Sequence, residues 1–181
     1  TLYREREGRL EPHLAATMPS VSDKGRTVRI ELKDGVRFHD GSSLHSSDVV
    51  RSLRRVLRDS RSGWLLSSIK SVDRSGTGLI LRLRRPDPDL PRLLAATTTS
   101  ITKGGRAPSF TRAIGSGAFS LGKVDRRRRT ISLVAFDQHF AGRPYVDRME
   151  LRWYSAADEE ARAFELGRSQ MSLSGSVAFV G

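Results

Sequence analysis

The sequence DGVRFHDGSSLHSSDVVRSLRRVL, residues 34–57, carries more structural information than any other stretch of this chain. Its first half holds two Asp-Gly pairs, which are typical of turns. Its second half places apolar residues at helical spacing, at Val49, Val50, Leu53, Val56 and Leu57. Ser46 or Ser47 is positioned to cap this helix, and Asp48 lies in its first turn, where a carboxylate favours the helix dipole. The stretch therefore predicts turns followed by an amphipathic helix.

The same stretch is also the first place to look for chemistry, because it holds His39, Asp40, His45 and Asp48. A metal site needs ligands that converge from rigid elements. His39 and Asp40 fall in a predicted turn, and the helix start accounts for Asp48. No G-x-S-x-G elbow is present, and no Lys-Ser or Lys-Thr pair follows the glycines of residues 115–117. We therefore predict no metal site, no cofactor and no catalytic residues.

Strands are expected on both sides of this stretch. Residues 27–32 alternate apolar and polar side chains, and the turn at Gly25 favours a hairpin with the preceding segment. Residues 79–83 alternate in the same way, with Leu79, Leu81 and Leu83 on one face. A short helix is expected to begin near Pro91. Strands and helices thus intermix, which indicates a mixed α/β fold.

The Gly-, Pro- and Ser-rich residues 103–117 predict a boundary between two structural units. Beyond it, residues 118–136 predict a hairpin with four arginines at its tip, and residues 147–154 predict a further strand. A helix should follow, with Ser155 and Asp158 at capping-box spacing. The last ten residues predict the beginning of one more strand.

The net charge of +12 comes from arginine, with 27 Arg against 5 Lys. A nucleic-acid-binding surface concentrates its basic residues on one face, whereas these arginines are spread along the chain. Direct nucleic-acid binding is therefore an alternative rather than the leading interpretation. The chain has no cysteine, which excludes disulfides and thiol nucleophiles. The first twelve residues have no apolar signal core, so an export signal is either absent or already removed.

Several separate motifs, in order along the chain, resemble the family 5 extracellular solute-binding proteins, the peptide- and nickel-binding components of ABC importers. The motifs are LEPHLAATM (10–18), TVRIELKDGVRFHDGSSLHSSDVVRSLRRVL (27–57), IGSGAFSL (114–121), FDQHFAGRPYVDRMELRWY (136–154) and EEARAFELGRSQMSL (159–173). The sequence departs from the family pattern at Ser116 and Ala118, where Thr and Pro are usual. The turn in LGRSQMSL (166–173), within the last of these motifs, also lacks the usual Glu and Asp.

The resemblance implies part of a periplasmic-binding-protein type II-like lobe with an inserted α+β subdomain. Residues 1–13 would belong to the first lobe, 14–112 to the inserted subdomain, and 113–181 to the first lobe again. Family members are more than twice as long, so the chain is similar to an N-terminal section that stops before the second lobe. Such a partial lobe is expected to expose apolar surface and unpaired strand edges, which favour self-association.

By resemblance, the segment SRSGWLLSS (60–68) supplies pocket residues, namely Arg61 and Trp64. Arg61 could bind a carboxylate through two hydrogen bonds, and Trp64 offers a flat ring with an N–H donor. The alternative is that Trp64 belongs to the core and Arg61 is simply solvated. Thr98 and Thr99 lie in a second pocket-lining segment by resemblance, although they could also merely end a helix.

The function that the resemblance implies is capture of peptides or a related small solute for the permease subunits of an ABC importer, without bond chemistry. A periplasmic or extracellular location follows from it. A second alternative is the solute-sensing domain of a bacterial transcription regulator, which would lie in the cytoplasm. The third is the nucleic-acid-binding domain considered above.

Overall fold

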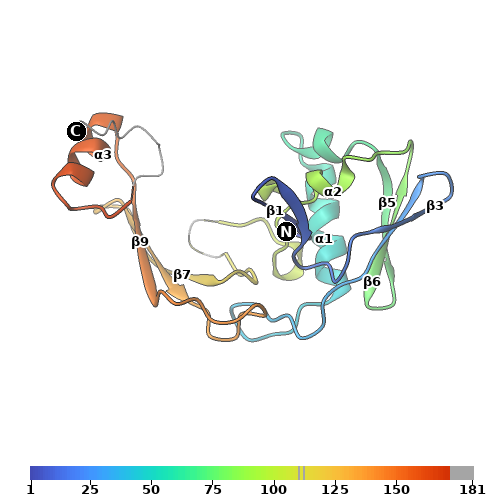
Figure 1. Ribbon diagram of the computed structural model, residues 1–181, viewed down its shortest axis with the longest axis horizontal. Helices are drawn as coiled ribbons and strands as arrows, with labels where there is room; N and C mark the ends of the chain where they lie inside the picture. Colours follow the sequence, from blue (N-terminus) through green and yellow to red (C-terminus); the bar gives the residue numbers. More distant parts are fainter. Residues whose placement is uncertain (110, 112, 172–181) are drawn as a thin grey trace.

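The computed structural model describes residues 1–109, 111 and 113–171. Two parts are joined at one end, so that the chain has a bent outline (Figure 1). The larger part, called the body here, contains everything up to the short helix η3 (Lys103–Gly105). The smaller part, called the arm, contains a three-stranded sheet and one helix. The mixed α/β fold expected from the sequence is confirmed.

The centre of the body is an antiparallel sheet of four strands in the order β3–β4–β6–β5. Its strands are β3 (Ser20–Ser22), β4 (Thr27–Ile30), β5 (Ile69–Ser75) and β6 (Gly78–Leu83). Leu79, Leu81 and Leu83 are all buried, as their alternation predicts. The hairpin through Gly25 is also confirmed, since β3 pairs with β4. The sequence reasoning did not identify β5.

Helix α1 (Ser46–Arg58) packs its apolar stripe against this sheet. Val49, Val50, Leu53 and Val56 lie in one core cluster with the leucines of β6. The arginines of the helix stay at least partly exposed, and Arg54 donates hydrogen bonds to the carbonyl oxygen of Val72 and to Asp73. The amphipathic pattern thus predicted correctly which face of α1 packs on the sheet and which face, with the arginines, lies toward solvent.

The start of α1 corrects one prediction. The cap residue is His45 rather than Ser46 or Ser47, which already lie in the first turn. The Asp48 carboxylate accepts a hydrogen bond of 3.0 Å from the His45 backbone N–H, which is the reciprocal half of a capping box. Ser46 is instead buried, and its hydroxyl donates to the carbonyl oxygen of Gly76. The carboxylate of Asp48, the third residue of the helix, therefore determines that α1 begins after His45.

Short elements complete the body. The hairpin β1 (Tyr3–Arg6) and β2 (Arg9–Pro12) brings Leu2 and Tyr3 into the same core, where Tyr3 is fully buried. Helix η1 (Gly63–Leu66) follows α1. Helix α2 (Leu90–Leu93) begins next to Pro91 as predicted, and η2 (Thr97–Thr99) follows it.

The arm is built from β7 (Phe119–Asp125), β8 (Thr130–Ala135) and β9 (Arg148–Arg152), paired in that order. The predicted hairpin is confirmed, with the arginines at its tip exposed. Helix α3 (Ala157–Glu165) follows β9, but its cap residue is Ala156, one position later than the predicted Ser155. The strand predicted for the last ten residues lies outside the part of the chain that the structure describes.

None of the helices described is both long enough and apolar enough to cross a membrane.

Candidate functional site

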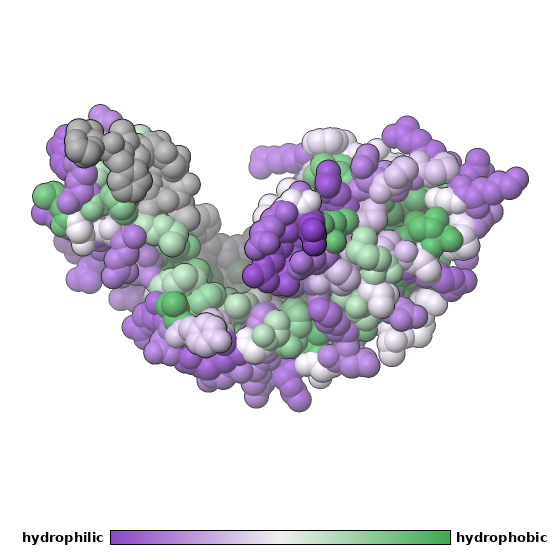
Figure 2. All heavy atoms as spheres, viewed as in Figure 1, coloured by the Kyte–Doolittle hydropathy of each residue, from purple (hydrophilic) through white to green (hydrophobic). Residues whose placement is uncertain are grey.

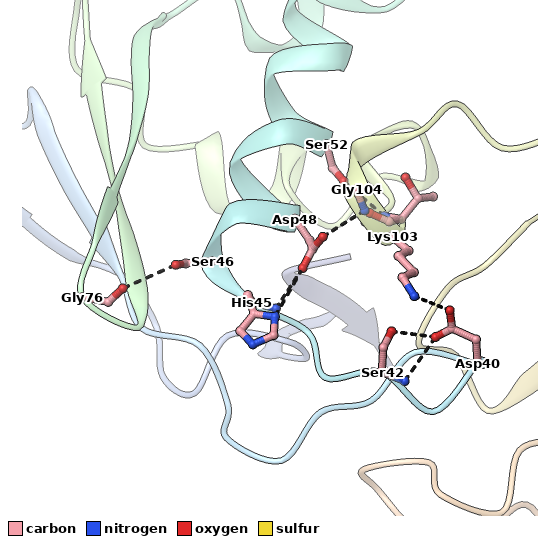
Figure 3. Close-up of polar contacts among 10 residues, drawn as sticks. Asp40, Ser42, His45, Ser46, Asp48, Ser52, Gly76, Lys103 and Gly104 are labelled. Carbon is pink, nitrogen blue, oxygen red and sulfur yellow. Dashed lines mark hydrogen bonds and ion pairs between the residues drawn. The ribbon is translucent and has the colours of Figure 1, made fainter.

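The polar residues of the sequence 34–57 lie near one another around the first turn of α1 (Figure 3). Asp48 is buried and accepts a second hydrogen bond, of 2.9 Å, from the backbone N–H of Gly104. Asp40 accepts hydrogen bonds from Ser42 and pairs with the ammonium group of Lys103. The hydrogen bond from Lys103, followed by those from Ser42, lowers the pKa of Asp40 to about 2.

Both acidic side chains of this cluster are therefore occupied by partners from the protein itself. Ser52 and Thr102 add a further tie between α1 and the segment that leads to η3, with the backbone N–H of Thr102 donating to the Ser52 hydroxyl at 3.1 Å. Within residues 1–109, 111 and 113–171 no three His, Asp or Glu side chains gather as metal ligands would. This arrangement fixes the segment leading to η3 on the first turns of α1.

Arg61 and Trp64 lie in the turn and short helix that follow α1. Trp64 is 70% exposed, and its indole N–H donates a 3.1 Å hydrogen bond to the backbone carbonyl of Arg61. The alternative that Trp64 belongs to the core is therefore wrong. The Arg61 side chain is exposed as well, close to the carboxylate of Asp59. The turn presents a flat ring and a guanidinium group to solvent, three residues apart.

Thr98 and Thr99 both lie in η2 but differ in access. Thr98 is exposed, whereas Thr99 is buried. The Thr99 hydroxyl donates a 2.8 Å hydrogen bond to the carbonyl oxygen of Ala96, as expected of a residue that stabilises a helix end. Of the two threonines, only Thr98 presents its side chain to an incoming molecule.

One cavity among the described residues lies elsewhere. It has a volume of about 1000 Å³ and is lined by the HDG turn (His39–Gly41), the first half of α1, η3, the loop between η3 and β7, and the start of β7. None of the four predicted site residues lines it. Its cationic side chains are Arg51, Lys103 and Arg106, and its acidic ones are Asp40 and Asp48. Figure 2 shows the molecule hollowed between the body and the arm.

Sequence reasoning missed this cavity because its walls come from segments about 50 to 80 residues apart. The one available signal is the KGG sequence at residues 103–105. Gly104 and Gly105 both have positive φ, and a Cβ on Gly105 would lie 2.5 Å from the Cβ of Arg51. Glycine is therefore needed for this turn to lie directly on α1.

A family profile matches residues 9–178, and its description reads bacterial extracellular solute-binding proteins, family 5. Among solved structures, NikA from Staphylococcus aureus in complex with Ni(L-His)2 superposes with a TM-score of 0.81 at 22% identity, over 93% of this chain and 36% of that one. AppA from Bacillus subtilis in complex with a nonapeptide superposes with a TM-score of 0.80 at 25% identity, over 92% and 36%.

Several curated proteins are similar to this chain in sequence. The uncharacterized protein YhjP of Bacillus subtilis is 32% identical over 82% of this chain and 25% of its own length. A probable di/tripeptide-binding protein of Pseudomonas aeruginosa is 28% identical over 93% and 38%. The HTH-type transcriptional regulator SgrR of Yersinia enterocolitica is 30% identical over 83% and 27%. The chain thus spans about a quarter to two fifths of the length of these relatives.

Proposed function

The chain belongs to the bacterial extracellular solute-binding proteins of family 5, and from this membership we propose that it is part of the solute-binding component of an ABC importer. In this role it captures a solute and delivers it to permease subunits in the membrane, without making or breaking a covalent bond. A periplasmic or extracellular location follows from the same proposal. The family match over residues 9–178 is the observation that carries it.

We propose peptides, or a related small charged solute, as the ligand class. Two similar proteins support this choice by what they are named for: a probable di/tripeptide-binding protein, and AppA in complex with a nonapeptide. The solved structures of NikA with Ni(L-His)2 and of MoaA with mannopinic acid have the same fold and hold other ligands, so the fold alone does not select the solute.

The proposed binding residues are Arg61, Trp64, Thr98 and Thr99. Arg61 would bind a carboxylate of the ligand, while the exposed Trp64 ring would cover its apolar part. The hydrogen bond from the indole to the Arg61 carbonyl holds the ring in one orientation before any ligand arrives. Thr98 would add a hydroxyl contact. Thr99 would act through the shape of η2, because its hydroxyl is already bonded to Ala96.

Binding in this fold would depend on closure of two lobes around the solute. A ligand favours the closed state only through contacts with both lobes. A chain that supplies one wall of the site should therefore bind peptides weakly, with a dissociation constant on the order of 1 mM, and sub-micromolar binding in calorimetry would contradict this mechanism.

The two tryptophans of the chain provide a test with an internal control. Short peptides are titrated into the protein while NMR monitors the two indole N–H signals. We expect the Trp64 signal to shift and the Trp153 signal to stay in place. Trp153 lies beyond β9 in the arm, away from the proposed residues. Nuclear magnetic resonance detects millimolar affinities, so weak binding stays measurable.

Arg61→Ala should abolish the Trp64 response to peptides that carry a free carboxylate. The matched control is Arg58→Ala, which removes an equally charged residue three positions earlier, at the last turn of α1. A Trp64 signal that stays unchanged at millimolar peptide, or that responds equally in both variants, would count against the proposed site.

A second function is supported by the similarity to SgrR, a transcription regulator that is 30% identical over 156 residues. In that case the chain would sense a solute in the cytoplasm, joined to a DNA-binding domain. Reading the gene upstream of Thr1 distinguishes the two proposals. A signal peptide there supports import, and a winged helix supports regulation.

A further inference from the structure

The HDG turn of the body holds the segment that leads into the arm. The backbone N–H of His39 donates a 2.8 Å hydrogen bond to the carbonyl oxygen of Gly115. The ring of His39 makes two more contacts with the same segment. Its Nε2 lies 3.0 Å from the carbonyl oxygen of Gly117, and its Nδ1 lies 3.4 Å from the backbone nitrogen of Gly115. These contacts join residues 76 and 78 positions apart in the sequence.

The partners of the ring determine which nitrogen carries the proton. The Gly115 N–H can only donate, so Nδ1 must accept, and the Gly117 carbonyl can only accept, so Nε2 must donate. Both contacts are satisfied by one species, the neutral ring protonated at Nε2. A doubly protonated ring would place an N–H at Nδ1 against the Gly115 N–H and would lose that hydrogen bond.

The ring also packs against the arm itself. His39 and Phe136, the residue after β8, meet edge to face with ring centroids 5.2 Å apart. Phe136 is buried, and its backbone N–H donates to the carbonyl oxygen of Ala118. His39 therefore contacts both the entering segment and the end of the second arm strand, so a change in the ring reaches the whole arm sheet.

We propose that His39 is a pH-sensitive latch, in which the neutral ring fixes the arm in one orientation on the body and protonation of the ring releases it. The latch concerns the shape of the chain and is independent of which solute the protein binds. It also gives a role to the HDG turn, which the proposed binding residues leave unexplained.

The charges around the ring support the direction of this effect. Burial lowers the pKa of His39 below its ordinary value of 6.5, and nearby His139 lowers it further. The hydrogen bond to Gly117 and the charge of Asp40 act in the opposite sense, and Asp40 is itself paired with Lys103 of η3. Because the folded state disfavours the protonated ring, the latch is complete above about pH 6.5 and weakens as the pH falls below it.

A second contact between arm and body also contains a histidine, and its pKa limits the pH range in which the latch can be tested. Phe140, between β8 and β9, packs against His13 with ring centroids 5.4 Å apart, and the Lys33 ammonium lies 5.5 Å from the same ring. Burial, with a smaller effect of the amino terminus, lowers the pKa of His13 to about 4. At about pH 5 His13 therefore stays mostly neutral, so a change seen between about pH 8 and pH 5 does not come from protonation of His13.

The experiment measures the distance between body and arm. Because the chain has no cysteine, the variants Lys70→Cys on β5 and Arg127→Cys at the arm hairpin tip provide two unique sites for spin labels. We expect one narrow distance distribution at about pH 8 and a broader one at about pH 5. His39→Gln should remove this response, because its amide keeps a donor and an acceptor but does not titrate in this range.

His45→Asn is the matched control, since His45 lies in the same sequence stretch but contacts Asp48 rather than the arm. It should keep the response of the unsubstituted chain. The latch is disproved if the unsubstituted chain gives the same distribution at both pH values, or if His39→Gln broadens equally.

A second measurement does not depend on any variant folding. Nitrogen-15 NMR of the His39 ring at about pH 8 should show the tautomer protonated at Nε2. The Nδ1-protonated tautomer would overturn the proposal by itself.

Discussion

Asp48 shows how one side chain organises two elements. Its carboxylate binds the backbone N–H of His45, at the start of α1, and the backbone N–H of Gly104, in η3. Both bonds are made by a residue that is only 8% exposed. Because buried N–H groups need partners, loss of this carboxylate leaves two donors unsatisfied.

We therefore expect Asp48→Ala to lower the free energy of unfolding by about 2–4 kcal/mol, measured by urea denaturation. The control is Asp73→Ala, which removes a carboxylate that is about half exposed and paired with Arg54. That change should cost less than about 1 kcal/mol. Equal losses in the two variants would show that Asp48 does not hold η3 on α1.

At the scale of elements, the sheet of the body depends on β6 as its organising strand. β6 pairs with β4 on one side and β5 on the other, and both pairs are antiparallel. Its central apolar residue, Leu81, is fully buried beneath α1, in the same cluster as Leu53. β6 therefore joins the strands on its two sides, whereas α1 packs over both β5 and β6, and mainly over β5.

Leu81→Ala should accordingly destabilise the protein by about 2–5 kcal/mol in thermal or urea unfolding, because it leaves a cavity under α1. The matched control is Val21→Ala on the outer strand β3, where the side chain is 59% exposed. A surface change of this kind should alter stability by less than about 0.5 kcal/mol. A small effect at Leu81 would contradict the central position of β6.

The arm behaves differently from the body at this scale. β9 has the predicted alternation, yet Leu151 remains 37% exposed and Trp153 38% exposed. Apolar alternation alone identifies a strand and its faces, but it does not state what covers them. Among the described residues, β9 pairs with β8 on one side, and α3 follows it in the chain.

For the whole molecule, this exposed surface predicts self-association. Leu151→Lys should shift the chain toward the monomer in sedimentation velocity at high protein concentration. Val21→Lys, which changes an even more exposed apolar residue of the body, should leave the association unchanged. If the unsubstituted chain is monomeric at the same concentration, the prediction of self-association is wrong.

The charge of +12 leads to a second prediction for the whole molecule. Of the 27 arginines, several are engaged in ion pairs on different elements, such as Arg4 with Glu11, Arg54 with Asp73 and Arg143 with Asp147. We expect binding to a generic DNA duplex to be negligible near physiological salt. Useful affinity there, with a steep dependence on salt, would instead support the nucleic-acid alternative.

The sequence by itself determined the elements whose signals are local. The alternation of β4 and β6, the stripe of α1, the arm hairpin and the family motifs all follow from residues close together in the chain. Their boundaries come within a few residues, because side-chain period and turn residues reflect backbone geometry directly. The HDG turn and the Arg61–Trp64 segment were likewise located by sequence, although what they contact was not.

Only the tertiary structure decided which distant groups meet. The pairing of Asp40 with Lys103 and the contacts of His39 with Gly115 and Gly117 join residues that are 63 to 78 positions apart in the sequence. The exposure of a side chain also depends on the tertiary structure, since Trp64 lies in solvent despite its apolar ring. A periodic pattern gives the face on which a side chain lies. The partner on that face depends on how the elements assemble, because such contacts arise from the whole chain folding together.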